Sequence, residues 1–338
     1  MNLDAFVAKN APTACKGMLL TIGMSGAVIF GVAIDSPTMS PFAAFGAMIA
    51  LHITPRHGVS AKIIGALAGC LFLLLAGSLS VAISGFPLLA LVLLFILSWL
   101  AALPKKNLMY IGFVTKCAAT AVLLSYFDFR LSLPMALYFC SGILLGLFLS
   151  LAAMAFEKED EERPIDQLRA LLHGDINNLS FSLITPVTVV VSSLIAEMFS
   201  YANPAWVGLT VIFVSNSNHR LELRRVLDRV MGTVAGTFVA YLILSYWHLP
   251  LRLALIVGVF AFFMPFVTKQ YSLFSFLITC VVLVLINIAM FREGGALGLL
   301  LWRCVDTIFG CACVLVSDLI LRYIYWRKTH SASKDKKA

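Results

Sequence analysis

Charge is scarce in this sequence. Lys, Arg, Asp and Glu together make up 12% of its 338 residues, whereas roughly 25% is usual for a soluble domain. Hydrophobic residues make up 61%, and apolar runs long enough to cross a bilayer recur along the chain. This composition excludes an ordinary soluble domain and predicts an all-α polytopic membrane protein. The net charge of +8 does not indicate nucleic-acid binding, because the basic residues lie at the ends of apolar segments and not in one patch.

Signatures of soluble enzymes are missing as well. The sequence contains no phosphate-binding P-loop, no GxSxG motif and no dinucleotide fingerprint. All eight cysteines fall in apolar segments, which predicts buried free thiols. Cys311 and Cys313 are two residues apart, so on a helix they face different ways, and no His or carboxylate cluster joins them. We therefore predict no catalytic residue, no metal site and no cofactor.

Apolar segments separated by short loops that carry Pro, Gly, Asn or charge predict about twelve membrane helices. With the N-terminus in the cytoplasm, the inner loops hold most of the Lys and Arg residues, and the outer loops hold only Arg130, Arg252 and Arg292. This bias predicts a multi-pass protein with both termini cytoplasmic. The predicted spans are residues 15–34, 40–53, 61–84, 86–103, 108–126, 133–156, 178–200, 204–216, 226–247, 250–267, 271–291 and 296–325.

The two halves of the chain resemble each other at an offset of about 165 residues. Ser40-Pro41 opens one short apolar run and Asn203-Pro204 opens the other, and each leads through a basic turn into a helix with paired glycines. Six spans per half make the two repeats parallel, with a substrate site expected between them. The predicted domains are a first repeat (1–156), a cytoplasmic linker (157–177), a second repeat (178–326) and a basic disordered tail (327–338).

The two short segments are candidates for the substrate site. Each has too few apolar residues to span alone, and each starts with a cap residue followed by Pro, which fixes a helix N-terminus that suits an anion. The alternative interpretation is a tilted helix that ends in the membrane interface. We predict substrate contacts from Ser40, Asn203, Trp206 and Thr210 of these segments.

Ionisable residues inside apolar runs normally face a cavity or a partner, because a charge in hydrocarbon costs about 2.5–3.5 kcal/mol. Lys116 has no partner within one helical turn and is predicted to hold an anion. Arg303 and Asp306 share a helix face and are predicted either to pair structurally or to bind substrate (Arg303) and the coupled proton (Asp306). Asp318 is predicted to pair with Arg322.

Basic turns are predicted at the inner mouth. Topology and binding to lipid headgroups explain most of this charge, and attraction of anionic substrate is a second role. The residues are Arg56, His57, Arg220, Arg224 and Arg225.

One stretch of the second half resembles a known family. NPAWVGLTVIFVSNSNHRLELRRVLDRVMGTVAGTFVAYLIL, beginning at Asn203, is similar to the most typical segment of the fusaric acid resistance and aromatic acid exporter family of inner-membrane proteins. Its features are a Pro-led short helix, a polar break, a basic entry and a glycine-paired helix. WRCVDTIFG (302–310) resembles a second family signature, with Arg303, Asp306, Thr307 and Gly310 at the matching places.

The resemblance implies export of small organic, chiefly aromatic, acids from the bacterial inner membrane, driven by the proton gradient. It also implies work with a periplasmic adaptor and an outer-membrane channel. Longer members carry a sizeable cytoplasmic domain, which we expect to be reduced here to residues 157–177 and the tail. Two alternatives stay open: an anion channel, as in a related plant branch, and a non-transport scaffold or lipid-modifying enzyme. Assembly as a homo-oligomer is also left open.

Overall fold

The computed structural model describes residues 3–53, 58–105, 108–128, 132–153, 163–199, 204–289 and 297–335. Within these ranges the chain forms α-helices, joined by short turns, and no β-strand. The helices of the first half are α1 (Leu3–Ala33), α2 (Ser40–Ile53), α3 (Val59–Ala82), α4 (Pro87–Ala102), α5 (Met109–Leu123, continued by a π-helical turn at Leu124–Asp128) and α6 (Leu133–Ala152).

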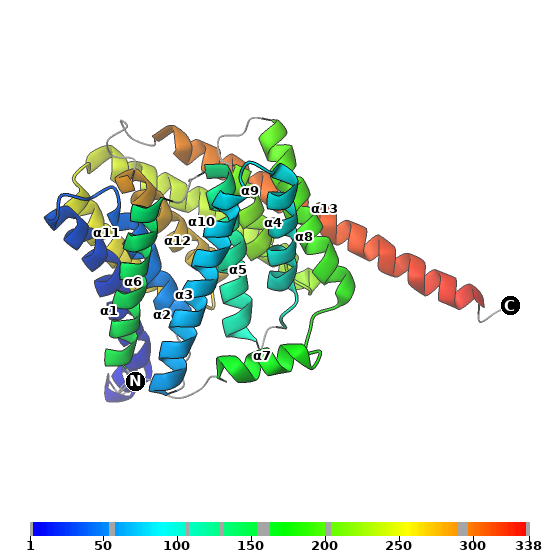
Figure 1. Cartoon of the computed structure of the whole chain (residues 1–338), viewed down its shortest axis with the longest axis horizontal. Coiled ribbons are helices and arrows are strands. Elements are labelled where there is room, and N and C mark those ends of the chain that lie inside the picture. The colour runs from blue at the N-terminus through cyan, green and yellow to red at the C-terminus, as the bar shows by residue number, and fades with distance from the viewer. Residues whose placement is uncertain are drawn as a thin grey trace.

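The short helix α7 (Pro164–Leu172) precedes the second half. Figure 1 shows it lying across one end of the bundle, while the last helix extends well beyond the other helices toward the C-terminus. The helices of the second half are α8 (Leu179–Met198), α9 (Pro204–Val214), α10 (His219–Tyr246), α11 (Pro250–Phe263, continued by a 3-10 turn at Met264–Phe266), α12 (Tyr271–Ala289) and α13 (Leu297–Asp335).

Every predicted span coincides with a helix, although three boundaries differ from the expected ones. Helix α1 begins at Leu3. Helix α10 begins at His219 because the Asn218 side chain accepts hydrogen bonds from the backbone N–H groups of Arg220 and Leu221, at 3.1 and 3.4 Å, and so caps the helix. Helix α13 runs on to Asp335, into the tail for which we predicted disorder; the Lys, Arg and Ala residues there have high helix propensity.

Eight of the helices are long and apolar enough to cross a membrane. The other apolar helices, α2, α4, α9 and α11 with its 3-10 turn, have 10–17 residues, which is less than one full crossing requires. Large apolar side chains are exposed on the outward faces, for example Leu71, Phe238 and Leu255, as a lipid-facing surface needs. The fold is therefore that of a multi-pass helical membrane protein, and the count of twelve spans stays a prediction.

Helices from the two halves interleave in the core. Helix α1 packs on α11 and α4 packs on α8, while α2 packs on α6 and α9 on α13. One buried apolar cluster joins α1 and α2 to α10, α11 and α12. The other joins α3, α4 and α5 to α8, α9 and α13. We expected two separate bundles with a site between them. The halves are interleaved instead, because the first helix of each half packs against the fourth helix of the other.

The linker between the halves is docked and not merely solvated. Asn177 Nδ2 donates hydrogen bonds to the carbonyl oxygens of Ala102 and Pro104, at 2.9 and 2.8 Å. Gln167 of α7 is buried, and its side-chain oxygen accepts a hydrogen bond from the N–H of Tyr110 in the first turn of α5. The linker thus ties the α4–α5 turn to the start of the second half.

We predict that Asn177→Ala lowers the free energy of unfolding by about 1–3 kcal/mol, because it removes two part-buried hydrogen bonds to the carbonyl oxygens of Ala102 and Pro104. Thermal unfolding of the purified protein in detergent measures this change. The control is Arg169→Ala, which removes only the exposed Arg169–Asp166 ion pair at 3.5 Å and should shift the midpoint little. Equal shifts for both variants would contradict the docking role of Asn177.

Candidate functional site

The contact between α9 and α13 brings most of the predicted site residues together. Gly310 allows this contact: a Cβ atom at this position would lie 2.9 Å from the carbonyl oxygen of Val207 and 2.9 Å from Cβ of Thr210. Thr210 is fully buried, and its hydroxyl donates to the carbonyl oxygen of Trp206 at 2.8 Å. One and two turns before Gly310, Asp306 and Arg303 lie on the same face of α13. They are 1% and 5% exposed.

Arg303 stacks on the indole ring of Trp206. The guanidinium carbon lies 4.0 Å from the centre of the ring, and both side chains are buried. A cation over an aromatic face is attracted by the ring quadrupole, by about 2 kcal/mol or more where water is excluded. Two residues that we predicted independently as substrate contacts are therefore in direct contact with each other.

Asp306 is buried beside this stack without a hydrogen bond. Neither of its carboxylate oxygens accepts one from the part of the chain that the structure describes, and no ion pair within 4.0 Å joins it to Arg303 there. Asp306 nevertheless lies within range of the charge of Arg303, so the two residues interact electrostatically without a direct hydrogen bond. Thr307 Oγ1, on the next position of α13, is also buried without a hydrogen bond to the described residues. Buried polar groups normally have partners, so this face of α13 is a candidate site for a ligand or a proton.

Lys116 lies in a different part of the protein. Its ammonium group is 5.9 Å from the centre of the Phe213 ring, and it lies within range of the charge of Arg225 on α10. Phe213 is seven residues beyond Trp206 on α9, which is about 10 Å along a helix. Lys116 and Arg303 therefore face opposite ends of α9, and one carboxylate group does not reach both of them as we had predicted.

The remaining predicted residues divide into three groups. Ser40 is fully buried, and its hydroxyl donates to the carbonyl oxygen of Pro37 at 2.6 Å, so it closes the α1–α2 turn. Arg220 and Arg224 are exposed, with Arg224 at 3.9 Å from Asp228. Asn203, Arg56 and His57 lie outside the described residues.

The predicted pair of Asp318 and Arg322 is confirmed at 3.1 Å. Sequence reasoning missed three buried charged residues: Lys62, Glu222 and Arg229. Lys62 Nζ donates to the carbonyl and hydroxyl oxygens of Ser150, at 3.1 and 3.2 Å. Lys62 and Glu222 lie in the first turn of α3 and α10, and Arg229 lies at the start of the predicted span 226–247. Charged residues at such positions usually face water, so the pattern gave no signal of burial.

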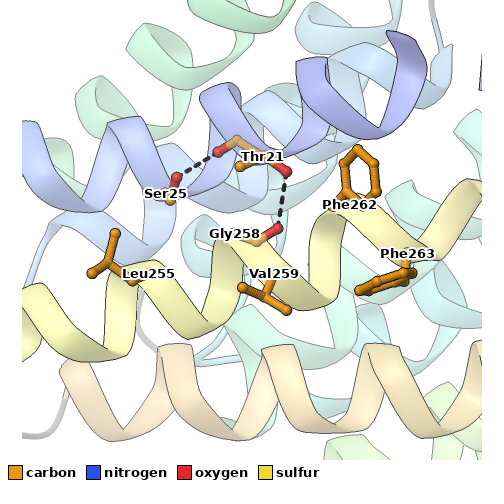
Figure 2. Close-up of a pocket in the computed structure, with 7 residues that line it drawn as sticks. All are labelled: Thr21, Ser25, Leu255, Gly258, Val259, Phe262 and Phe263. Atoms are coloured by element: carbon orange, nitrogen blue, oxygen red, sulfur yellow. Dashed lines mark hydrogen bonds between the residues drawn. The ribbon is translucent and has the colours of Figure 1, made fainter. Parts of the chain in front are cut away.

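A pocket of about 380 Å³ lies between α1 and α11, away from these residues (Figure 2). At its edge Thr21 Oγ1 donates to the carbonyl oxygen of Gly258 at 2.9 Å, and Ser25 Oγ donates to that of Thr21 at 2.6 Å. Leu255, Val259 and Phe263 line it and are strongly exposed. We interpret it as a dent in the apolar outer surface, and none of the predicted site residues lines it.

These features define a class: a multi-pass helical membrane protein with buried ionisable side chains where α9 and α13 cross. Residues 190–317, which contain this crossing, match the family model described as fusaric acid resistance protein-like. The match confirms, over these residues, the family that the motifs predicted.

One curated relative is similar to part of the chain. An uncharacterised protein of Haemophilus influenzae is 32% identical over 128 residues, which make up 37% of this chain and 17% of that protein. The matched segment thus spans less than a fifth of that relative's length. No solved structure matches the chain at a significant level.

We predict that Gly310→Ala destabilises the protein by about 1–3 kcal/mol, because the added methyl group overpacks the α9–α13 contact. The matched control is Gly26→Ala in α1, where nothing lies within 4 Å of the added atom, and a small stabilisation is expected there. Thermal unfolding in detergent compares the two. Equal stability of Gly310→Ala and wild type would show that α9 and α13 pack less tightly at Gly310 than in the structure.

Proposed function

We propose that this protein is a secondary transporter of the bacterial inner membrane that exports small organic acids, chiefly aromatic ones. The observation that carries the proposal is Asp306, a buried carboxylate without a hydrogen bond to the described residues, on the same helix face as Arg303. The family match over residues 190–317 supports it. Arg303 suits the substrate carboxylate, and the indole of Trp206 offers a flat apolar surface to an aromatic ring.

Asp306 is the coupling residue in this proposal. When Asp306 is ionised, its negative charge offsets that of Arg303 and repels an anionic substrate. When it is protonated, the charge of Arg303 is available to the substrate carboxylate. Proton binding and substrate binding are therefore linked, so that the proton and the anion bind together. In this scheme the cytoplasmic concentration of the acid, and not an inward proton gradient, drives export.

We also infer that the halves are parallel repeats. The contacts between helices support this, because each has a counterpart: α2–α6 with α9–α13, α4–α5 with α11–α12, α3–α5 with α10–α12, and α1–α11 with α8–α4. The Lys and Arg bias supports cytoplasmic termini.

A periplasmic adaptor, an outer-membrane channel and self-association belong to the proposal by family resemblance alone. Co-purification from crosslinked membranes tests all three.

We expect Arg303→Gln to abolish most transport. Removing one member of a buried charge contact costs about 2–5 kcal/mol, so substrate affinity should fall roughly 30-fold or more. Uptake of radiolabelled benzoate into proteoliposomes measures the effect. Arg252→Gln, at an exposed position, is the matched control and should transport like wild type. Full transport by Arg303→Gln would rule out this site, and steady single-channel currents from the wild type would favour an anion channel.

We expect Asp306→Asn to remove the response of transport to pH. In the wild type, benzoate affinity should fall as pH rises through the titration of Asp306, because ionisation places a negative charge beside Arg303. The Asn variant imitates the protonated form, so it should bind benzoate with an affinity that does not depend on pH. Asp35→Asn, on an exposed turn, is the control. Wild-type flux that ignores an imposed pH difference across the liposome membrane would refute the proton coupling.

A further inference from the structure

A second group of cationic side chains lies at the opposite end of α9 from Arg303. Lys116 comes from α5, and Arg225 and Arg229 come from successive turns of α10. Arg229 is 6% exposed, and its Nε has no hydrogen-bond partner among the residues that the structure describes. Lys116 lies within range of the charge of Arg225. Three like charges are thus gathered in a region that is buried at Arg229 and half-buried at Lys116 and Arg225, where they repel each other unless an anion joins them.

Two aromatic rings border this group. Phe213 lies beside Lys116 at 5.9 Å, and Tyr271 lies beside Arg225 at 5.8 Å. The Tyr271 hydroxyl is buried and, within the described ranges, donates no hydrogen bond; it also lies within range of the charge of Arg229. The Tyr271 oxygen lies within reach of a hydrogen bond from the Arg229 side chain. The hydroxyl proton of Tyr271 and the N–H at Nε of Arg229 are then left without an acceptor among the described residues. A carboxylate, which has two acceptor oxygens, satisfies both.

The carboxylates of the described residues do not neutralise the group. Glu222 is the carboxylate within range of the charge of Arg225, and its Oε2 accepts a hydrogen bond from the N–H of Asn216 at 3.3 Å. Glu222 also lies within range of the charge of Arg322, whose Nε is 3.1 Å from Oδ2 of Asp318. Asp228 lies 3.9 Å from the exposed side chain of Arg224. An excess of positive charge therefore remains at Lys116, Arg225 and Arg229.

Cys311 of α13 lies between this group and the Arg303 site. It is 2% exposed and lies within range of the charges of both Arg229 and Arg303. Its thiol points toward the carbonyl oxygen of Val226 on α10, at 3.9 Å. It follows Gly310, the residue at which α13 crosses α9. The two cationic sites are thus arranged one behind the other along α9, α10 and α13, with the narrow crossing between them.

We propose that Lys116, Arg225 and Arg229 form a second binding site for an aromatic monocarboxylate, which loads the Arg303 site from the α10 N-terminal end. The Lys and Arg bias places that end in the cytoplasm. The cations hold the carboxylate, and the rings of Phe213 and Tyr271 flank the aromatic group. The transport path then runs inside the second half, with α5 as the contribution of the first half. This inference rests on the proposed function.

Binding stoichiometry tests the second site. Wild-type protein in nanodiscs should bind two benzoate ions per chain in equilibrium dialysis, whereas Lys116→Gln and Arg225→Gln should each weaken one of the two by roughly tenfold or more. Arg252→Gln, at an exposed position on α11, is the control and should keep both. Monodisperse gel filtration of each variant verifies folding. A single benzoate in the wild type, or two unaltered ones in Lys116→Gln and Arg225→Gln, would overturn the proposal.

The same measurement separates this proposal from the proposed function. Arg303→Gln should lose the other benzoate and keep the one at Lys116. If Arg303→Gln transports normally while Lys116→Gln loses a benzoate, the proposed function fails and the second site stands. If Arg303→Gln loses transport while the wild type binds one benzoate only, the second site fails and the proposed function stands.

The path between the sites is tested at Cys311. In a variant that keeps Cys311 as its only cysteine, a small anionic methanethiosulfonate should label this thiol, and labelling should stop benzoate transport. Saturating benzoate should slow the labelling several-fold, because it occupies the sites on either side. A transporting variant whose Cys311 is never labelled would place the path elsewhere.

Discussion

The close approach of α9 and α13 is the constraint on which the candidate site depends. Gly310 lets the two backbones come together against Val207 and Thr210, and this contact fixes where Arg303 meets the Trp206 ring. Because two packed helices exclude water from their contact, the charge of Arg303 acts in a medium of low polarity, where its attraction for an anion is strongest. A site built in this way needs only a small relative movement of the helices to open or close.

The corresponding crossing of the first half is closed by small residues. At the offset that relates the two halves, Gly142 takes the place of Asp306 and Ala43 that of Trp206. Gly142 packs directly on the backbone of Ala43, and Gly46 packs directly on the backbone of Phe139, so no space remains there for a ligand. Of these two crossings, α9–α13 carries the buried charges and α2–α6 carries none among the described residues. The α2–α6 contact serves as a rigid support, and the polar residues have been concentrated in the half that matches the family model.

Much of this architecture could be predicted from the sequence, because apolar runs and their breakers determine helices locally. The burial of Arg303 and Asp306 followed from their place inside an apolar run, and the pairing of Asp318 with Arg322 followed from helical spacing. The contact of Arg303 with Trp206, and the grouping of Lys116 with Arg225, could not be predicted. They depend on which helices pack together, and a membrane helix interface is decided by small residues whose partners lie far away in sequence.

The interleaved packing also limits how the protein can move. Two halves that rock as rigid bodies would have to break the α1–α11 and α4–α8 contacts, including the hydrogen bond from Thr21 to the carbonyl oxygen of Gly258. Both buried clusters contain helices of both halves, so such rocking would disrupt the whole core. Movement of α13 against α9 and α10 leaves the α1–α11 and α4–α8 contacts in place. This movement of α13 would change the spacing at Gly310 and Cys311, which lie between the two cationic groups. A gate at this crossing is therefore more consistent with the packing than rocking of whole halves.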